Sequence, residues 1–335
     1  MKTMINKEVS NMLKGCAAIF VLVNHIVCWL VTVNDVDTNI RELFGRLSDT
    51  GMFSFLFISG YGLYKSSIKN KMYNYWEKKI VRIVFPMLCA NCIGAFTFNL
   101  SNGIIPARKD LFEGITSICL DYNGIMWYIH YLLVWYMVFW MIFRILESRV
   151  TRIIAWIIAA CIISYLTPEI FGLANEYYLA FPFGVLWSSL EYNNSVFAHL
   201  IKFENIIIQR LGVVITCIGI LISTKYFRDI SHSIGNQEVG FWVYSVLINC
   251  LLGVTMIGLI LSLIRINGLR SRIIFTIIGK YSLAIYLLQE PIIFTWLKNI
   301  NSVMWAYTVV FIGLLFIGVI KNVYDKTIGR KLELA

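Results

Sequence analysis

The chain has 335 residues, of which 59% are apolar and only 14% carry a charge. About a quarter of the residues of a soluble globular domain are charged, so this composition excludes a soluble enzyme, a secreted disulfide-bonded scaffold and a disordered chain. The net charge of +10 does not indicate nucleic-acid binding, because the basic residues are distributed as in membrane proteins. These features predict a polytopic membrane protein with no nucleic-acid partner.

Apolar segments of about twenty residues, the length that crosses a bilayer, recur along the chain. We expect an all-α fold with one membrane domain over residues 1–335 and no soluble domain at either end. The second, fifth and sixth segments are short, which favours tilted or partly re-entrant helices. The ten expected transmembrane spans are 13–33, 51–64, 83–100, 124–143, 153–167, 177–190, 206–224, 241–263, 273–290 and 303–320.

Basic residues are divided unevenly between the two sets of loops that these spans define. The terminal segments and the loops on their side carry 21 Lys and Arg when Lys14 and Arg210, near the ends of two spans, are counted with them, whereas the opposite loops carry 7. Cytoplasmic loops are enriched in Lys and Arg. Both termini are therefore predicted to be cytoplasmic, in a cell membrane of the bacterial plasma-membrane type.

The first span contains two ionisable side chains, Lys14 and His25. Eleven residues at 100° each put them on one helix face, with a rise of about 16 Å between them. Ionisable groups inside a membrane are functional candidates, and a neutral imidazole can accept a proton. Two alternatives stay open: Lys14 extends to the lipid headgroups, or His25 is a hydrogen-bonded packing residue.

The second span ends in the segment 59–62, Ser-Gly-Tyr-Gly. Its glycines permit a close backbone approach or a helix break, in which Ser59 would bond a released carbonyl; a contact between small residues of two helices is the alternative. A basic segment follows and includes Lys79 and Arg82. Such a segment contacts anionic lipid or binds a ligand that carries phosphate.

Five segments, in order and with family-like spacing, resemble motifs of the acyltransferase-3 family of integral membrane acyltransferases. Lys14 and His25 resemble the motif that opens the family's domain, Arg or Lys followed by ten residues and His. Residues 55–63 resemble the Phe-Phe-x-x-Ser-Gly-Tyr/Phe motif, and residues 79–86 the basic-x-x-Arg-Ile-x-x-Pro motif. Residues 127–133 and 279–288 resemble the Trp-aromatic-Leu and the Gly-x-x-Ser-x-x-Ile-Tyr-Leu motifs. The resemblance runs from about residue 11 to 320 and is to the short form, which has no appended soluble domain.

The resemblance implies transfer of an acyl group from cytoplasmic acyl-CoA to a hydroxyl of a cell-surface or lipid-linked polysaccharide, as in glycan O-acetyltransferases. Acetyl is the first expectation and succinyl an alternative. By position, His25 would be the catalytic residue, and Lys14, Lys79 and Arg82 would bind the donor. Two positions depart from the family pattern. Lys14 stands where Arg is commoner, which keeps the charge but lacks the planar guanidinium group. Gln289 stands where many members have His.

Acyl transfer from a thioester also needs donors for the developing oxyanion, and the candidates are Ser59, Tyr61, Trp127 and Tyr128. Acceptor-side candidates are His130 and Glu290, with packing and interfacial anchoring as their alternative roles. Direct attack and an acyl-histidine intermediate both stay open. We expect no metal and no bound cofactor, since acyl-CoA is a co-substrate. The other expected partners are the glycan acceptor and the lipid bilayer, with room for a separate extracytoplasmic protein.

Two other function classes compete with the enzyme. Ten helices with buried polar residues also suit a transporter or exporter of a polysaccharide or lipid-linked sugar. The chain lacks paired short or broken helices at matching places in two halves, the mark of repeat-built transporters, and this favours the enzyme. A sensor or scaffold that has kept the fold and lost the chemistry is the third hypothesis, because Lys14 and Gln289 depart from the family pattern.

Overall fold

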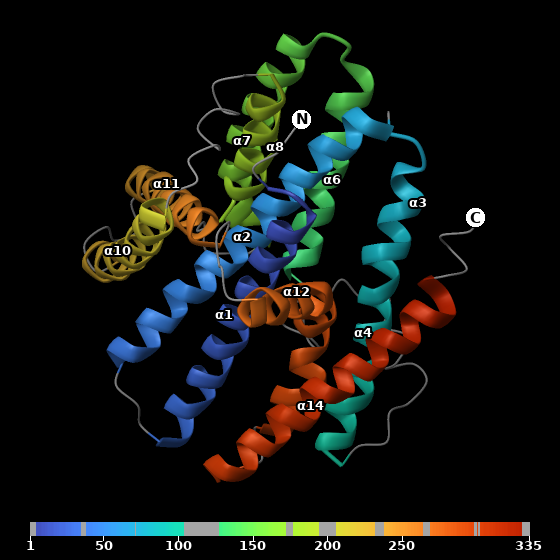
Figure 1. The fold of residues 1–335 in the computed structure, drawn as a ribbon, viewed down its shortest axis with the longest axis vertical. Helices are drawn as coiled ribbons and strands as arrows, with labels where there is room; N and C mark the ends of the chain where they lie inside the picture. Colours follow the sequence, from blue (N-terminus) through green and yellow to red (C-terminus); the bar gives the residue numbers. More distant parts are fainter. Residues whose placement is uncertain are drawn as a thin grey trace. The chain divides into compact units, whose positions relative to one another are not determined.

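The fold is drawn in Figure 1 from a computed structural model, which describes residues 5–34, 38–70, 72–103, 127–171, 177–193, 206–231, 238–263, 269–297, 300 and 302–329. Every regular element within these ranges is helical. The elements are α1 (Lys7–Asn34), α2 (Thr38–Asn70), α3 (Tyr75–Lys79), α4 (Phe85–Ser101), α6 (Trp127–Ile145), α7 (Arg149–Phe171), α8 (Ala180–Asn193), α10 (Ile206–Ser231), α11 (Glu238–Leu263), α12 (Leu269–Gln289), α13 (Thr295–Leu297) and α14 (Val303–Tyr324), with π-helical turns η1 (Ile80–Val84), η2 (Glu290–Phe294) and η3 (Asp325–Gly329).

A helix is found at each of the ten expected spans, so the all-α prediction is confirmed for the described residues; positions 124–126 of the fourth span lie outside them. The protein is a multi-pass membrane protein. The sidedness of its termini and its division into a single domain stay predictions. Six segments are long and apolar enough to cross a bilayer: Lys7–Val31, Tyr75–Ser101, Trp127–Ile145, Val246–Leu263, Arg272–Leu297 and Met304–Thr327.

Two of the three spans expected to be short belong to long helices. α2 has 33 residues and α7 has 23, whereas α8 has only 14. α2 continues before residue 51 because polar side chains there are paired: Nη1 of Arg46 lies 2.7 Å from Oδ2 of Asp49, and both residues are buried. Arg46, which falls between the first and second expected spans, therefore lies in a helix and not in a loop.

The first of two compact units comprises Met1–Met72 and Val134–Lys280, and in it α2 packs against α1 and α8. Two glycines let the backbones of α2 and α8 touch. A Cβ atom at Gly60 would lie 2.3 Å from the carbonyl oxygen of Phe181, and one at Gly184 would lie 2.0 Å from that of Phe57. The contact at Gly60 is the alternative expected for this segment, a contact between small residues of two helices. Gly62 has open space around it, and α2 is not broken at either glycine.

A buried aromatic cluster joins α6, α7 and α8 in the same unit. The ring of Trp135 stacks on Phe181 with centroids 5.7 Å apart and lies 5.3 Å from Trp156. The indole Nε1 of Trp156 donates to the carbonyl oxygen of Pro182 at 3.4 Å. Aromatic contacts of this kind hold the three helices together.

The second unit comprises Tyr73–Leu133 and Tyr281–Ala335. Its π-helical turns η1 and η2 each lie near a proline: Pro86 lies two residues after the end of η1, and Pro291 lies inside η2. Proline has no backbone N–H and its ring clashes with the carbonyl four residues earlier, so the helix widens locally to keep its other hydrogen bonds. η1 lies inside the 79–86 motif, and η2 begins two residues after the end of the 279–288 motif.

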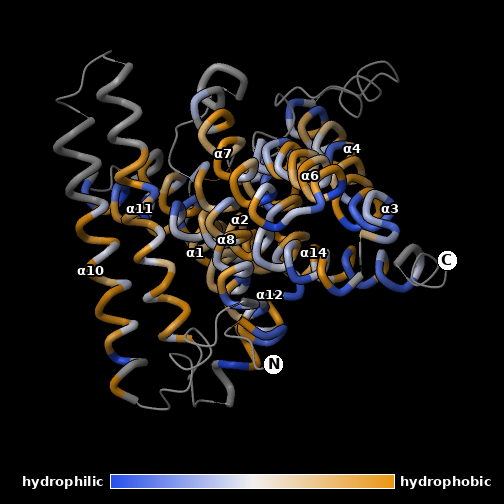
Figure 2. Tube along the Cα trace, turned by 90° about the horizontal axis from the view of Figure 1, so that it is seen from above, coloured by the Kyte–Doolittle hydropathy of each residue, from blue (hydrophilic) through white to orange (hydrophobic). Residues whose placement is uncertain are grey.

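Apolar side chains cover the outside of several helices. On α14, Met304, Tyr307 and Phe311 are 71%, 65% and 64% exposed. Figure 2 shows α10 and α11 coloured as hydrophobic along most of their described length. Contiguous exposed apolar surface of this extent is the surface that a bilayer covers.

Candidate active site

The first part of the candidate site is one side of α1. This helix is unbroken from Lys7 to Asn34, so Lys14 and His25 do lie on a common stripe, about 20° apart around the axis. Both side chains are half-buried. An uninterrupted helix fixes their separation along the axis at about 16 Å.

On one side of this stripe α1 crosses α12. A Cβ atom at Gly279 would lie 1.8 Å from the carbonyl oxygen of Asn11, and one at Gly15 would lie 2.1 Å from that of Phe275. Only glycine fits two backbones this close. The glycine that begins the 279–288 motif therefore holds α12 against the turn of α1 that carries Lys14.

On the other side of the stripe α1 packs against α2. A Cβ atom at Gly51 would lie 2.9 Å from the carbonyl oxygen of Ala17 and 3.3 Å from Cγ2 of Val21. Around the helix axis, Lys14 and His25 lie between the residues that contact α2 and those that contact α12. Both side chains thus project from the side of α1 that lies between two packed helices.

Ser59 and Tyr61 lie on α2, and their hydroxyl groups already have partners. Oγ of Ser59 donates to the carbonyl oxygen of Phe55 at 2.8 Å and is also hydrogen-bonded by the Tyr136 side chain. Oη of Tyr61 donates to Oε2 of Glu191 at 2.5 Å. To stabilise an oxyanion, either hydroxyl would have to give up its present acceptor.

Tyr61 belongs to a polar cluster that the sequence did not indicate. The ammonium group of Lys65 donates to Oη of Tyr61 and lies 3.6 Å from Oε2 of Glu191, whose side chain is only 5% exposed. Lys65 Nζ also donates to the carbonyl oxygen of Ile5 at 3.4 Å. The cluster ties the segment before α1 to the ends of α2 and α8.

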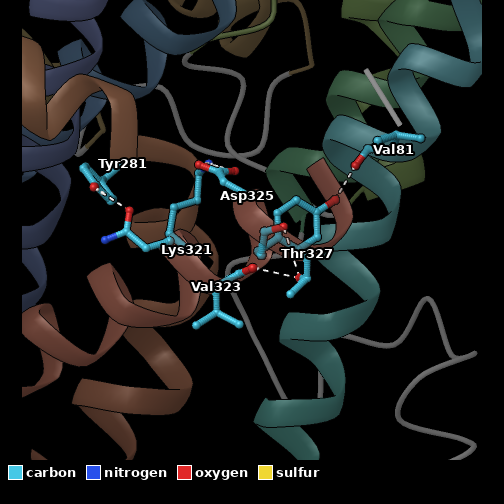
Figure 3. A network of polar contacts seen from close by, with 8 residues as sticks. Val81, Tyr281, Lys321, Val323, Asp325 and Thr327 are labelled. Atoms are coloured by element: carbon cyan, nitrogen blue, oxygen red, sulfur yellow. Dashed lines mark hydrogen bonds and ion pairs between the residues drawn. The ribbon is translucent and has the colours of Figure 1, made fainter. Parts of the chain in front are cut away.

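Lys79 and Arg82 lie in the second unit, at the end of α3 and within η1. Lys79 is half-buried with its ammonium 5.6 Å from the centroid of the Tyr75 ring, and Arg82 is exposed. Figure 3 shows how α14 fixes this segment: Oη of Tyr324 donates to the carbonyl oxygen of Val81 at 2.8 Å. The backbone beside Arg82 is therefore anchored from a distant part of the chain.

The same network reaches the 279–288 motif. Oη of Tyr281 donates to Oδ1 of Asn322 at 2.9 Å (Figure 3). Because Asn322 and Tyr324 both lie in the last turn of α14, that helix connects the segment of Arg82 to α12. Two motifs far apart in the sequence are thus held by one helix end.

The remaining four predicted residues also lie in the second unit. Tyr128 is buried on α6, with its ring 5.0 Å from that of Tyr286 in an edge-to-face contact and 6.2 Å from that of Trp127. His130 is half-buried on α6, and Glu290 is half-buried at the start of η2. The first unit thus contains Lys14, His25, Ser59 and Tyr61, and the second contains Lys79, Arg82, Trp127, Tyr128, His130 and Glu290.

Sequence reasoning missed a second buried polar group, formed by Arg46, Asp49 and Tyr177. Oη of Tyr177 donates to Oδ1 of Asp49 at 2.8 Å, in addition to the ion pair between Asp49 and Arg46. The spacing of Arg and Asp three residues apart, directly before an apolar helix, was the signal that was available. Within the described ranges, no group of three or more His, Cys, Asp or Glu side chains could hold a metal ion.

Comparison with known proteins identifies a family. Residues 10–323 match a protein-family model that is described as an acyltransferase domain. Searches of curated proteins and of solved structures find no match. The matched region covers nearly the whole chain and includes all ten predicted site residues.

Proposed function

The chain belongs to the acyltransferase 3 family, and we propose that it transfers an acyl group, acetyl in the first place, from cytoplasmic acyl-CoA to a hydroxyl of a cell-surface or lipid-linked polysaccharide. Membrane acyltransferase activity is what the family indicates. The choice of donor and acceptor is our inference. The observation that carries it is the stripe of α1 on which Lys14 and His25 lie between α2 and α12.

In the proposed reaction His25 is the general base. Its neutral imidazole accepts the proton of the attacking hydroxyl as the oxygen bonds to the thioester carbonyl carbon. The tetrahedral intermediate then releases the CoA thiolate, which takes the proton back from the imidazolium. No proton is gained or lost overall, and the histidine is ready for the next cycle.

Lys14 supports the same step from the other end of the stripe. We assign it to the donor, because a cation about 16 Å along the helix from His25 suits an elongated substrate with its charge at one end. Its place beside the contact between α1 and α12 favours this role over extension to the headgroups. Lys79 and Arg82 would bind further donor charge.

The proposal is tested by His25→Ala in a glycan acetylation assay, with Asn24→Ala as the matched control. Asn24 is the neighbouring residue of α1 and lies on a different side of the helix, about 100° away. His25→Ala should keep its expression level and elution profile and lose transfer by a factor of about 100 or more, the usual contribution of a general base. Asn24→Ala should keep transfer. Full acetylation by His25→Ala would exclude the proposed role.

A further inference from the structure

A pocket of about 410 Å³ opens in the first unit between the end of α2 and the turn that joins α6 to α7. Three arginines line it, Arg144, Arg149 and Arg152. The positive-inside rule predicts this end of the helices to be cytoplasmic. The pocket has the volume of a small-molecule site and lies on the side from which a soluble donor would approach.

The guanidinium groups are arranged for an anion rather than for protein carboxylates. Within the residues that the structure describes, Arg144 and Arg149 form no ion pair, and no Asp or Glu lines the pocket. Both arginines are exposed. Uncompensated cations that converge on one cavity attract a multiply charged anion.

Arg152 is held in place by its surroundings. Its Nε donates to the carbonyl oxygen of Leu146 at 2.6 Å, and its guanidinium lies 5.7 Å from the centroid of the Phe143 ring. The ring of Phe143 also meets Tyr64 edge to face at 5.8 Å. One side of the cavity is thus aromatic and carries a fixed guanidinium plane, the combination that accepts a nucleobase beside its phosphates.

We propose that this pocket binds the nucleotide end of acyl-CoA, with Arg144 and Arg149 on its phosphate groups and the base beside Arg152 on the aromatic side of the cavity. This assignment rests on the proposed function, because it adds further donor-binding residues to those already assigned to the donor, Lys14, Lys79 and Arg82. Anionic lipid headgroups present the same phosphate chemistry. The aromatic wall and the volume of the pocket favour the nucleotide.

The test measures binding of CoA, dephospho-CoA and 3′,5′-ADP to the full-length protein in phosphatidylcholine nanodiscs. The variant is Arg144→Gln/Arg149→Gln, and the matched control is Arg210→Gln, an exposed arginine of α10 outside the pocket. Loss of one charge-assisted bond weakens binding about tenfold. We therefore expect the affinity for CoA and for 3′,5′-ADP to fall by about tenfold or more in the double variant and to stay unchanged in Arg210→Gln.

A second arm replaces part of the lipid with phosphatidylglycerol. The proposal requires wild-type CoA binding to survive in these nanodiscs and the double variant to retain as much phosphatidylglycerol as the wild type. Unchanged CoA affinity in the double variant, with loss of retained phosphatidylglycerol, would assign the pocket to lipid and overturn the proposal. A wild-type protein that binds none of the three probes would instead refute the proposed function.

Discussion

Two glycines of one motif, Gly60 and Gly62, are predicted to respond in opposite ways to the same substitution. At Gly60 an added Cβ atom meets the backbone of α8 at 2.3 Å from the Phe181 oxygen, whereas at Gly62 nothing lies within 4 Å. Both residues lie inside α2, so the helical context is matched. Gly60→Ala should therefore destabilise the protein and Gly62→Ala should stabilise it.

The size of each effect follows from the packing. Ordinary contact of a Cβ atom begins at 3.4 Å, so α2 and α8 must separate by about 1 Å to admit Ala at position 60, and overpacking of this kind costs roughly 1–3 kcal/mol. In a helix interior Ala is favoured over Gly by about 1 kcal/mol, which is the gain expected at position 62. The two variants should differ in unfolding free energy by about 2–4 kcal/mol.

Thermal unfolding in detergent, followed by tryptophan fluorescence at one scan rate, measures this difference. A gap of about 5 °C or more in apparent Tm is expected, with Gly60→Ala below the wild type and Gly62→Ala above it. Gly184→Ala, which tests the reciprocal contact with Phe57, should behave like Gly60→Ala. Equal apparent Tm values for Gly60→Ala and Gly62→Ala would refute the proposed backbone contact between α2 and α8.

Three further predictions concern charge and hydrogen bonding. Asp49→Asn should lower the unfolding free energy by about 3–5 kcal/mol, because it leaves the buried Arg46 without its counter-charge. The double variant Arg46→Met/Asp49→Leu, which has no charge at either position, should recover most of the loss in apparent Tm. A double variant as unstable as Asp49→Asn would contradict this role of the ion pair. Tyr324→Phe removes the hydrogen bond to Val81 and should raise KM for acetyl-CoA about fivefold with little change in kcat. A fall in kcat alone would show that Tyr324 does not position the segment of Lys79 and Arg82 for donor binding. Lys14→Met should weaken acetyl-CoA binding about tenfold and Lys14→Arg should restore it, and equal binding by both would remove Lys14 from the donor site.

The sequence predicted the helices and the α1 stripe because both depend on local information. A span requires only a run of apolar residues, and the alignment of Lys14 with His25 requires only helical periodicity and an unbroken α1. The role of Gly279 was not predictable in this way. A glycine is needed at position 279 because the backbone there contacts Asn11, more than 260 residues earlier in the chain. No local sequence pattern indicates such a contact.

The sequence also did not predict which charged residues are buried or which of them lie together. Averaged hydropathy treats Arg46 and Asp49 as loop residues, because it counts two polar side chains and cannot count the bond between them. In the sequence, Arg144, Arg149 and Arg152 served only to predict which side of the membrane their loop lies on. Their convergence on one pocket depends on how α6 and α7 pack through Trp135 and Trp156, which is decided by tertiary structure.

The use of acyl-CoA as donor is the central claim, and its most direct test is binding of acetyl-CoA to the purified, detergent-solubilised protein, wild type beside Lys79→Ala/Arg82→Ala. We expect saturable binding to the wild type that weakens in the double variant. Folded protein that binds neither acetyl-CoA nor succinyl-CoA would contradict it. That result would favour a polysaccharide or lipid-linked sugar transporter, and glycan movement across liposomes without acyl-CoA would then be the outcome to look for.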